Sequence, residues 1–437
     1  MLDIKFIREN PDKVRTGAKS KNIEINIDEI LKLDEEVRTI SLTLQELYTQ
    51  RNRAAKERDV EGGREIKTEV DSSEDKLRKI KEKLDALLYA IPNLPAPDVK
   101  IGKDEPQNEV IRKHGEPRKF DFSAKGLLRS EASETSPKGG RPRDHVELGE
   151  ILDIIDIERA AKVSGTRFAY LKNEGVLLEF ALAQFAFDSL IKEGFIPVIP
   201  PELIKTEIMK SLGYMERGGA EDMFHIEKDG LTLVGTAEHA IVAMHMDETF
   251  LERDLPKRYV GFSSAFRREA GSYGKDTRGI LRVHQFDKVE MVSYTTPEKS
   301  DEEHEYLVSI EERFFQALKI PYQVVKMCTA DLGFVQARKY DLEAWIPSQE
   351  KYREVTSASH VTDFQARRLN IRYLPAGRQG QNGSGKDFVH TLNATGFAIG
   401  RTLIAILENY QEADGSVIVP EVLRNYINLD KISPKNK

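Results

Sequence analysis

The residues best suited to chemistry lie in one stretch of the chain, from Tyr259 to Tyr294. Arg267 and Glu269 stand two positions apart where an apolar, strand-like run ends, and Arg282 and Phe286 stand four apart on the alternating run that returns. Side chains two or four positions apart in a strand point to the same face. One surface could therefore carry two guanidinium groups, a carboxylate and an aromatic ring.

That set of side chains suits a nucleotide. Arg267 can hold a phosphate group through two parallel hydrogen bonds. Glu269 can accept a hydrogen bond from an exocyclic amine, and Phe286 can stack under a purine. The stretch predicts a nucleotide-binding antiparallel hairpin with a mobile, cationic tip around residues 271–279. A surface hairpin whose charges are merely solvated is the alternative.

Two further clusters offer oxygen ligands. Thr236-Ala237-Glu238 follows a predicted strand, which leaves the Glu238 carboxylate free to bind a small cation such as an amino group. Glu354 and Ser357 place a carboxylate and a hydroxyl three positions apart, and Mg²⁺ prefers oxygen ligands of this kind. Taken alone, each cluster also has an ordinary explanation, such as a helix cap or a strand end.

Composition limits the classes of protein that fit. The chain has 437 residues, 39% of them hydrophobic and 32% charged, which favours two or three domains with a large core. The net charge of -7 gives no overall positive field, so nucleic acid would have to bind through local patches. The one cysteine, Cys328, excludes an intramolecular disulfide and a multi-thiolate zinc site, and we expect no zinc.

Targeting signals are not evident in the sequence. The first residues, MLDIKFIREN, are charged from the start and do not read as a signal peptide. No apolar run approaches the ~18 residues that a membrane span needs. We therefore expect a soluble, cytoplasmic protein with no membrane partner.

The elements that must position these groups begin with a helical hairpin. After a short helix that ends near Asn10 and a connection, apolar residues recur every seven positions from Asp28 to about Arg58, and again from Ile66 to Ile91. A Gly-containing break at 59–63 separates the two segments, which predicts an antiparallel coiled-coil arm (about 28–91) whose helices are each about 45 Å long. The arm is either a dimerisation zipper or spacer, or a probe that reaches a large partner.

Domain boundaries follow from proline and polar residues. The run Ile91 to Pro97 contains three prolines and ends the arm, so residues 1–97 form a first domain. Residues 98–150 read as a polar linker with a disordered insert at 123–143. Residues 151–437 form the second domain, in which 375–385 is a second flexible loop.

The second domain mixes helices with antiparallel strands, so the fold class is α+β. Apolar helices are predicted at 175–193, 298–318 and 396–410. Strands are predicted at 195–201, 223–226, 231–234, 322–327, 342–346 and 388–392, besides the hairpin. No βαβ unit repeats and no GxxxxGK[ST] motif occurs, which argues against a Rossmann sheet and against a P-loop enzyme.

Several runs of residues together resemble a known family. Pro201 after FIPVIP, FRREAG at 266–271, and the segment from Asn393 to Arg401 look like the three motifs of the class II aminoacyl-tRNA synthetases. The runs TAE, RVHQFDKVEM, WIPSQ and DFQARR, together with the N-terminal arm, are typical of one branch. Over nearly its whole length the chain resembles bacterial seryl-tRNA synthetase.

The resemblance implies a class II catalytic domain and an activity. It implies ATP-dependent, Mg²⁺-assisted activation of L-serine to seryl-adenylate, followed by transfer to the 3′ end of tRNA(Ser), with tRNA(Sec) left open as a second acceptor. It also implies a homodimer in which the arm contacts tRNA across subunits. A synthetase-like ligase that loads a carrier protein is the alternative, and a non-catalytic tRNA-binding protein is a third reading.

The resemblance also implies roles in the ATP site. Arg267 would grip the serine carboxylate and the α-phosphate, Glu269 would read the adenine amine, and Arg282 would hold the γ-phosphate of a bent ATP. Phe286 and Arg401 would enclose the adenine, and Glu354 and Ser357 would ligate Mg²⁺. The remaining ATP-site residues that it implies are Arg268, Val283, Val355 and Thr356.

Serine would lie beside the nucleotide. In the resemblance, Glu238 takes the serine ammonium group, while Glu290 and Thr395 bond its hydroxyl; Thr236 and Ala237 complete the site. A pocket with polar groups that need a hydroxyl partner rejects alanine.

Five positions depart from the family pattern. Gly235 stands where proline is usual, His239 replaces an apolar residue, Ala358 and His360 stand where Cys and Asn are common, and Ala394 replaces a glycine. The expected ligands are all present, so these departures bear on the shape of the pocket.

Overall fold

The computed structural model describes residues 1–120, 141–216, 218–270, 278–377 and 385–435. Contacts between residues divide the chain into two compact units, 1–95 and 96–437. Most of the predicted insert at 123–143, of the hairpin tip and of the loop at 375–385 lies outside the described residues.

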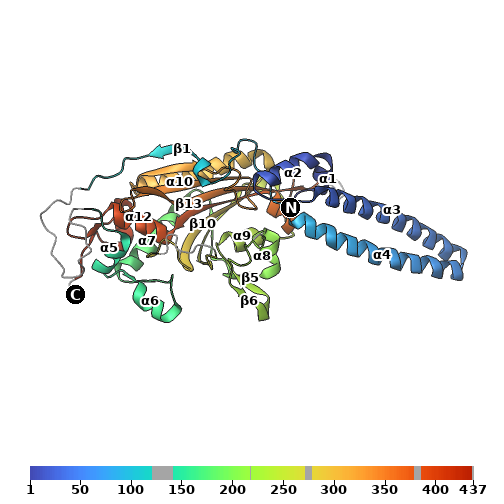
Figure 1. The fold of residues 1–437 in the computed structure, drawn as a ribbon, viewed down its shortest axis with the longest axis horizontal. Helices are drawn as coiled ribbons and strands as arrows, with labels where there is room; N and C mark the ends of the chain where they lie inside the picture. The colour runs from blue at the N-terminus through green and yellow to red at the C-terminus, as the bar shows by residue number, and fades with distance from the viewer. Residues whose placement is uncertain (121–140, 217, 271–277, 378–384, 436–437) are drawn as a thin grey trace. The chain divides into compact units, whose positions relative to one another are not determined.

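The first unit is helical and contains the predicted arm (Figure 1). The two long helices form an antiparallel hairpin around a small apolar cluster that includes Leu44, Leu47 and Val70. Heptad spacing produces this seam because residues at its a and d positions return to one side of each helix. The helices of the unit are α1 (Ile4–Glu9), α2 (Pro11–Ser20), α3 (Ile27–Glu57) and α4 (Val60–Tyr89).

Two details of the first unit differ from the sequence prediction. The turn of the arm is made by Arg58, in the left-handed conformation, and Asp59, not by the glycines. The Asp59 side chain accepts a hydrogen bond of 3.0 Å from the Gly62 amide, which caps α4. Pro11 begins a second helix where a connection was predicted, because the first helical position needs no amide donor.

The second unit is built on an eight-stranded sheet with the order β1-β11-β12-β13-β16-β10-β9-β4. Every neighbouring pair is antiparallel except β4 and β9. The predicted hairpin, β9 with β10, lies in this sheet. The strands are β1 (Glu109–His114), β4 (Ile196–Val198), β9 (Lys257–Phe266), β10 (Gln285–Thr295), β11 (Tyr322–Lys326), β12 (Arg338–Ile346), β13 (Lys351–Thr362) and β16 (His390–Ala398).

Three strands correct the prediction. β1 pairs with β11 although its residues read as part of a polar linker. β13 was not predicted, and β16 continues to Ala398, past the expected helix start at Gly396. Residues 391–397 of β16 are all buried, so this strand has no alternation by which it could be recognised.

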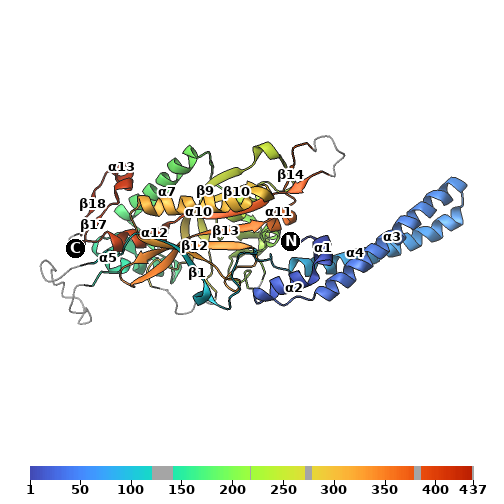
Figure 2. The ribbon, with the colours of Figure 1, turned by 90° about the horizontal axis from the view of Figure 1, so that it is seen from above.

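Helices pack on the sheet around two hydrophobic clusters, and the larger of these forms the main core. In Figure 2, α10 lies lengthwise along the sheet. Met291, Ala358 and Leu392 point into this core, whereas Lys288, Ser357 and Asn393 from the same strands line a cavity. The helices are α5 (His145–Ile151), α6 (Ile157–Ser164), α7 (Glu174–Lys192), α8 (Thr206–Leu212), α9 (Glu238–Ala243), α10 (Ser300–Ala317), α11 (Phe364–Leu369), α12 (Ile399–Asn409) and α13 (Arg424–Ile427).

Small sheets complete the unit. The sheet β5-β7-β6 leads into the segment that carries Thr236. Among the described helices, none combines the length and the apolar character required to cross a membrane. The remaining strands are β2 (Ile155–Asp156), β3 (Tyr170–Leu171), β5 (Leu203–Lys205), β6 (His225–Ile226), β7 (Leu231–Leu233), β8 (Thr249–Leu251), β14 (Arg372–Leu374), β15 (Asp387–Phe388), β17 (Val417–Ile418) and β18 (Lys431–Ile432).

Candidate active site

A cavity of about 560 Å³ lies over the central strands of the sheet. Its wall comes from the segment after β7, the ends of the β9–β10 hairpin, strands β12, β13 and β16, and the start of α12. Most of the residues predicted for the site line this cavity: Thr236, Glu238, Arg267, Glu269, Arg282, Val283, Phe286, Glu354, Val355, Thr356, Ser357, Thr395 and Arg401.

Three predicted residues do not line the cavity. The Ala237 side chain is fully buried in a second hydrophobic cluster. Arg268 follows Arg267 in an extended segment and points the other way, with its guanidinium carbon 5.4 Å from the centre of the Phe224 ring. Glu290 is fully buried in the centre of β10.

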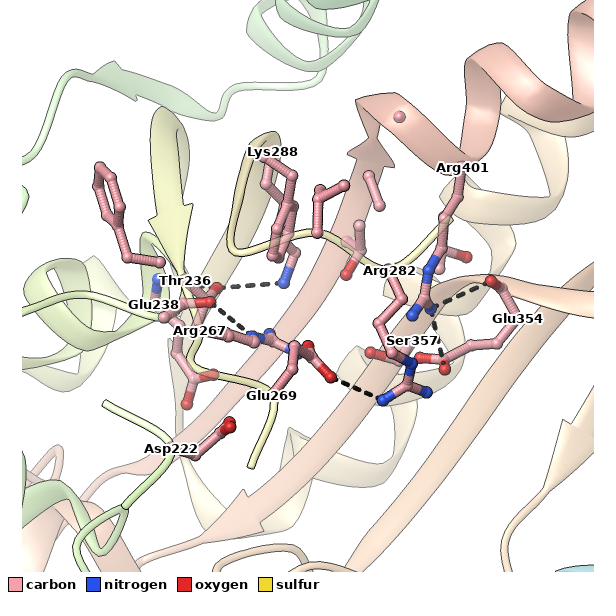
Figure 3. A pocket seen from close by; sticks show the side chains of 18 of the residues that line it. Asp222, Thr236, Glu238, Arg267, Glu269, Arg282, Lys288, Glu354, Ser357 and Arg401 are labelled. Carbon is pink, nitrogen blue, oxygen red and sulfur yellow. Dashed lines mark hydrogen bonds and ion pairs between the residues drawn. The ribbon is translucent and has the colours of Figure 1, made fainter. Parts of the chain in front are cut away.

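The cavity is ordered from one end to the other (Figure 3). Thr236, Glu238 and Lys288 lie at one end, called the inner end below. Glu354, Ser357 and Arg401 lie at the other, the outer end, and Arg267 and Glu269 lie between the two.

In the middle of the cavity, the hairpin brings its predicted groups together. The guanidinium carbon of Arg267 lies 5.3 Å from the centre of the Phe286 ring. Glu269 has a φ of 52°, in the left-handed region, and its Oε2 accepts a hydrogen bond of 2.7 Å from Nη1 of Arg282. The expected surface of guanidinium groups, carboxylate and ring is therefore present, although Glu269 and Arg282 are paired with each other.

At the outer end, Glu354 and Arg401 form an ion pair. Nη1 of Arg401 lies 3.0 Å from Oε2 of Glu354 and also donates to the Glu354 carbonyl oxygen at 3.2 Å. Burial acts to raise the pKa of Glu354, but the positive charges of Arg401 and Lys339 outweigh it and lower this pKa to about 2. The carboxylate is therefore ionised at neutral pH.

The same end has the donor atoms for a magnesium ion. The ionised Glu354 carboxylate and the Ser357 hydroxyl both face the cavity from β13. Nowhere in the described part of the chain do three or more His, Cys, Asp or Glu side chains cluster in a way that could hold a metal. Mg²⁺ binds with few protein ligands when phosphate and water oxygens supply the others, and this donor set fits that mode.

At the inner end, Glu238 is a buried carboxylate with neutral donors. Its Oε1 accepts hydrogen bonds from the Tyr214 hydroxyl at 2.7 Å and from Nε2 of Gln365 at 3.2 Å. Only 4% of Glu238 is exposed, and burial raises the pKa of its carboxyl group. A cation placed beside it would stabilise the ionised form.

Lys288 connects this end to Glu290. Its Nζ lies 2.5 Å from Oε2 of Glu290 and donates to Oγ1 of Thr236 at 3.1 Å. Burial raises the pKa of Glu290 to about 7, against the opposing effect of Lys288. Glu290 on β10 stands opposite Thr395 on β16 in the sheet register, so a carboxylate and a hydroxyl lie side by side.

Sequence reasoning missed several residues of the cavity. Lys288 could have been found, because the alternation that puts Phe286 and Glu290 on one face of β10 puts it there too. Tyr214 and Lys339 had no such signal, since they come from the turn after α8 and from β12, whose positions depend on the tertiary fold.

Comparison with known proteins agrees with this architecture. Residues 223–410 match the tRNA synthetase class II core domain (G, H, P, S and T), and residues 1–95 match the seryl-tRNA synthetase N-terminal domain. The fold and the site thus define a class II aminoacyl-tRNA synthetase. A prolyl-tRNA synthetase from Giardia lamblia, 16% identical with a TM-score of 0.55 over 64% of this chain, shares the fold alone.

Relatives along the whole chain define the family more narrowly. The serine–tRNA ligase of Fervidobacterium nodosum is 42% identical over 450 residues, covering 99% of this chain and 100% of its own length. The crystal structure of seryl-tRNA synthetase from Pyrococcus horikoshii complexed with ATP has a TM-score of 0.88 and 43% identity over the full length of both chains. The cytoplasmic serine–tRNA ligase of Naegleria fowleri in complex with AMP has a TM-score of 0.87 and 32% identity, covering 100% of this chain and 99% of its own. The chain belongs to the seryl-tRNA synthetase family.

Proposed function

We propose that the chain activates L-serine with ATP and transfers the seryl group to the 3′ end of tRNA(Ser). The single observation that carries this function is the order of groups in the cavity. Guanidinium groups and a ring suited to ATP adjoin a buried carboxylate and hydroxyl suited to serine. Relatives of this chain that were crystallised with ATP and with AMP support a nucleotide in the same fold.

In the first step, an oxygen of the serine carboxylate attacks the α-phosphorus and pyrophosphate leaves. A carboxylate is already nucleophilic at neutral pH, so the step needs in-line placement and charge stabilisation more than a general base. Arg267 lies between the two ends of the cavity and bonds the serine carboxylate and the α-phosphate. Phe286 and Arg401 enclose the adenine.

ATP binding rearranges the ion pairs of the free site. Glu269 reads the adenine amine and Arg282 holds the γ-phosphate, so the hydrogen bond of 2.7 Å between them gives way to bonds with the nucleotide. Glu354 and Ser357 hold Mg²⁺, which when bound offsets negative charge on the phosphates. The walls of the ATP site include Val283, Val355 and Thr356. Arg268 lies outside the cavity, against the Phe224 ring, and contributes to the ATP site only indirectly.

The inner end selects serine. Glu238 binds the ammonium group, and the neighbouring Glu290 and Thr395 bond the hydroxyl, with Thr236 and Ala237 shaping the site. Alanine lacks the hydroxyl and would leave the buried Oε1 of Glu290 without a hydrogen-bond partner, which supports discrimination by orders of magnitude.

The arm of α3 and α4 contacts tRNA, and the protein acts as a cytoplasmic homodimer. Exposed apolar side chains on α7 support an interface with a second copy: Leu177, Phe180 and Ile191 are 45%, 61% and 46% exposed and fall on one side of the helix. In the dimer, the arm of one subunit serves tRNA bound at the other.

Amino-acid-dependent exchange of pyrophosphate into ATP, run with each of the amino acids, tests the first step. We expect exchange with serine, and with alanine lower by about a hundredfold or more. Charging of tRNA(Ser), tRNA(Sec) and a carrier protein then identifies the acceptor. Exchange with another amino acid would refute the serine site, and charging of a carrier protein instead of tRNA would favour the alternative ligase.

A further inference from the structure

The segment that leads into the serine end of the cavity contains a glycine whose amide is held by a histidine. The backbone N–H of Gly235 donates a hydrogen bond of 3.2 Å to Nδ1 of His239, and this bond is buried. His239 is 3% exposed, in the first turn of α9, and its ring centre lies 4.4 Å from that of Tyr214. Because Nδ1 accepts this bond, the ring must be the neutral tautomer with its proton on Nε2.

The same glycine holds Arg267. The Gly235 carbonyl oxygen accepts a hydrogen bond of 3.1 Å from Nε of Arg267. On the other side, the peptide group between Val234 and Gly235 is bonded at both its ends, since the Val234 carbonyl accepts from the Phe266 amide at 2.9 Å. His239 therefore holds the N–H side of the peptide group between Val234 and Gly235. The next carbonyl along the chain, that of Gly235, is the one that accepts the hydrogen bond from the Arg267 side chain.

We propose that His239 is a positioning residue that fixes Gly235 and, through its carbonyl, the guanidinium group of Arg267. Glycine has fewer steric limits on φ and ψ than other residues, so holding the peptide group before Gly235 removes one source of freedom in the direction of its carbonyl. The inference rests on the proposed function insofar as Arg267 is the residue that binds the serine carboxylate and the α-phosphate.

The glycine at position 235 and the histidine at position 239, which both depart from the family pattern, are then explained together, because one donates the hydrogen bond that the other accepts. A proline at 235 has a fixed φ and no N–H, so it needs neither a restraint nor an acceptor at 239. With glycine at 235, an apolar residue at 239 would leave a buried amide donor unpaired. Burial and the charges of Arg267 and Lys288 lower the pKa of His239 to about 3, so the ring remains a neutral acceptor at physiological pH.

Five variants test the pair through the kcat and KM of serine-dependent pyrophosphate exchange. We expect H239L and G235P each to lower kcat/KM about tenfold, because each leaves one partner of the bond unsatisfied. The double variant G235P/H239L should recover to within about threefold of the original protein. H239N, whose side-chain oxygen can accept the same bond, should retain activity. G235A is the matched control, since an added Cβ would meet His239 Cε1 at 3.4 Å, an ordinary contact, and would keep the N–H.

The inference is overturned if H239L and G235P lower activity additively in the double variant, or if H239L has no effect. Thermal midpoints identify variants that merely unfold. Nuclear magnetic resonance of ¹⁵N-labelled histidine and arginine supplies a readout that needs no activity. The His239 Nδ1 signal should be that of an unprotonated nitrogen, and H239L should shift the Arg267 Nε–H signal while H239N leaves it in place. If the protein shows no exchange with any amino acid, the proposed function fails, and these signals alone decide the role of His239.

Discussion

The arm and the cavity differ in how far their charged side chains are exposed to solvent. Along the arm, ion pairs such as Arg53 with Glu57 lie on the surface, where the two side chains are 79% and 59% exposed, and the central seam is apolar. At the inner end of the cavity, Glu238 and Lys288 are 4% and 7% exposed, and Glu290, which pairs with Lys288 from the centre of β10, is fully buried. The arm therefore buries mainly apolar groups, and its buried charge, Asp34 of α3, is 5% exposed and paired with Arg8 and Arg38, whereas the cavity buries several charged groups close together.

The difference indicates what each region is stabilised for. A seam of leucine, isoleucine and valine is complete without a partner. Buried charges are costly unless they are paired, and at the inner end Lys288 faces two carboxylates, Glu238 and Glu290, whose pKa values are both raised by burial. Ligands that bring an ammonium group and a hydroxyl would complete that network, so the cavity gives up stability that substrate binding returns.

Replacement of Arg267 by alanine is the strongest test of this contrast. We expect serine-dependent exchange to fall by about 10²–10³-fold, because a group that stabilises developing charge is removed, while the thermal midpoint changes little. R253A removes an exposed arginine of the same unit, 78% exposed, and serves as the control. An R267A protein with full exchange activity would refute the assigned role.

Replacement of Leu44 by alanine tests the arm. Leu44 is 4% exposed in the seam, so its loss should destabilise α3 and α4 by about 2–4 kcal/mol, seen as faster hydrogen exchange of their amides. Serine-dependent exchange should be unchanged while tRNA charging falls. L42A, at a position 63% exposed on the same helix, is the matched control. A parallel loss of pyrophosphate exchange would show that the two regions are not energetically separate.

Lowering the pH should reduce the folding stability of the protein, because a histidine is buried in the sheet. His360 on β13 is 4% exposed, and both ring nitrogens lack hydrogen-bond partners among the described residues. Burial, followed by the charges of His304 and His390, lowers its pKa to about 2. The unfolded chain therefore binds a proton below about pH 6.5 that the folded chain does not, and folding stability falls as the pH is lowered through that value.

H360N removes this titration and keeps a residue of similar polarity. Between pH 7.5 and 5.5, urea unfolding should show the original protein losing about 1.4 kcal/mol more stability than the variant. Parallel pH profiles for the two proteins would contradict the assignment of the acid sensitivity to His360.

Removal of the Arg53–Glu57 pair should have the smallest effect. Both side chains are exposed, so R53A should change the stability of the arm by less than about 0.5 kcal/mol, measured by hydrogen exchange of α3. A loss above about 1 kcal/mol would mean that surface ion pairs contribute to the arm as buried ones do to the sheet.

Many elements of this structure could be predicted from the spacing of residues in the sequence. Heptads predict the arm, alternation predicts the β9–β10 hairpin, and the short motifs carry the resemblance from which the residues proposed to bind serine and ATP were taken. The same spacing misplaced the arm's turn and the start of α12, since Asp59 can cap a helix that contains glycines and β16 is buried on both faces. β13, with Glu354 and Ser357, carries no alternation and was missed as a strand.

The sequence by itself determined which side chains share a face, because the repeats of 2.0 residues in a strand and 3.6 in a helix are properties of the local backbone. Tertiary structure alone decided which faces meet. It paired Glu269 with Arg282, put Lys288 between Thr236 and Glu290, and set the His239 ring against the Gly235 amide. The strength of those contacts depends on burial, and burial is produced by strands and helices that come from distant parts of the chain.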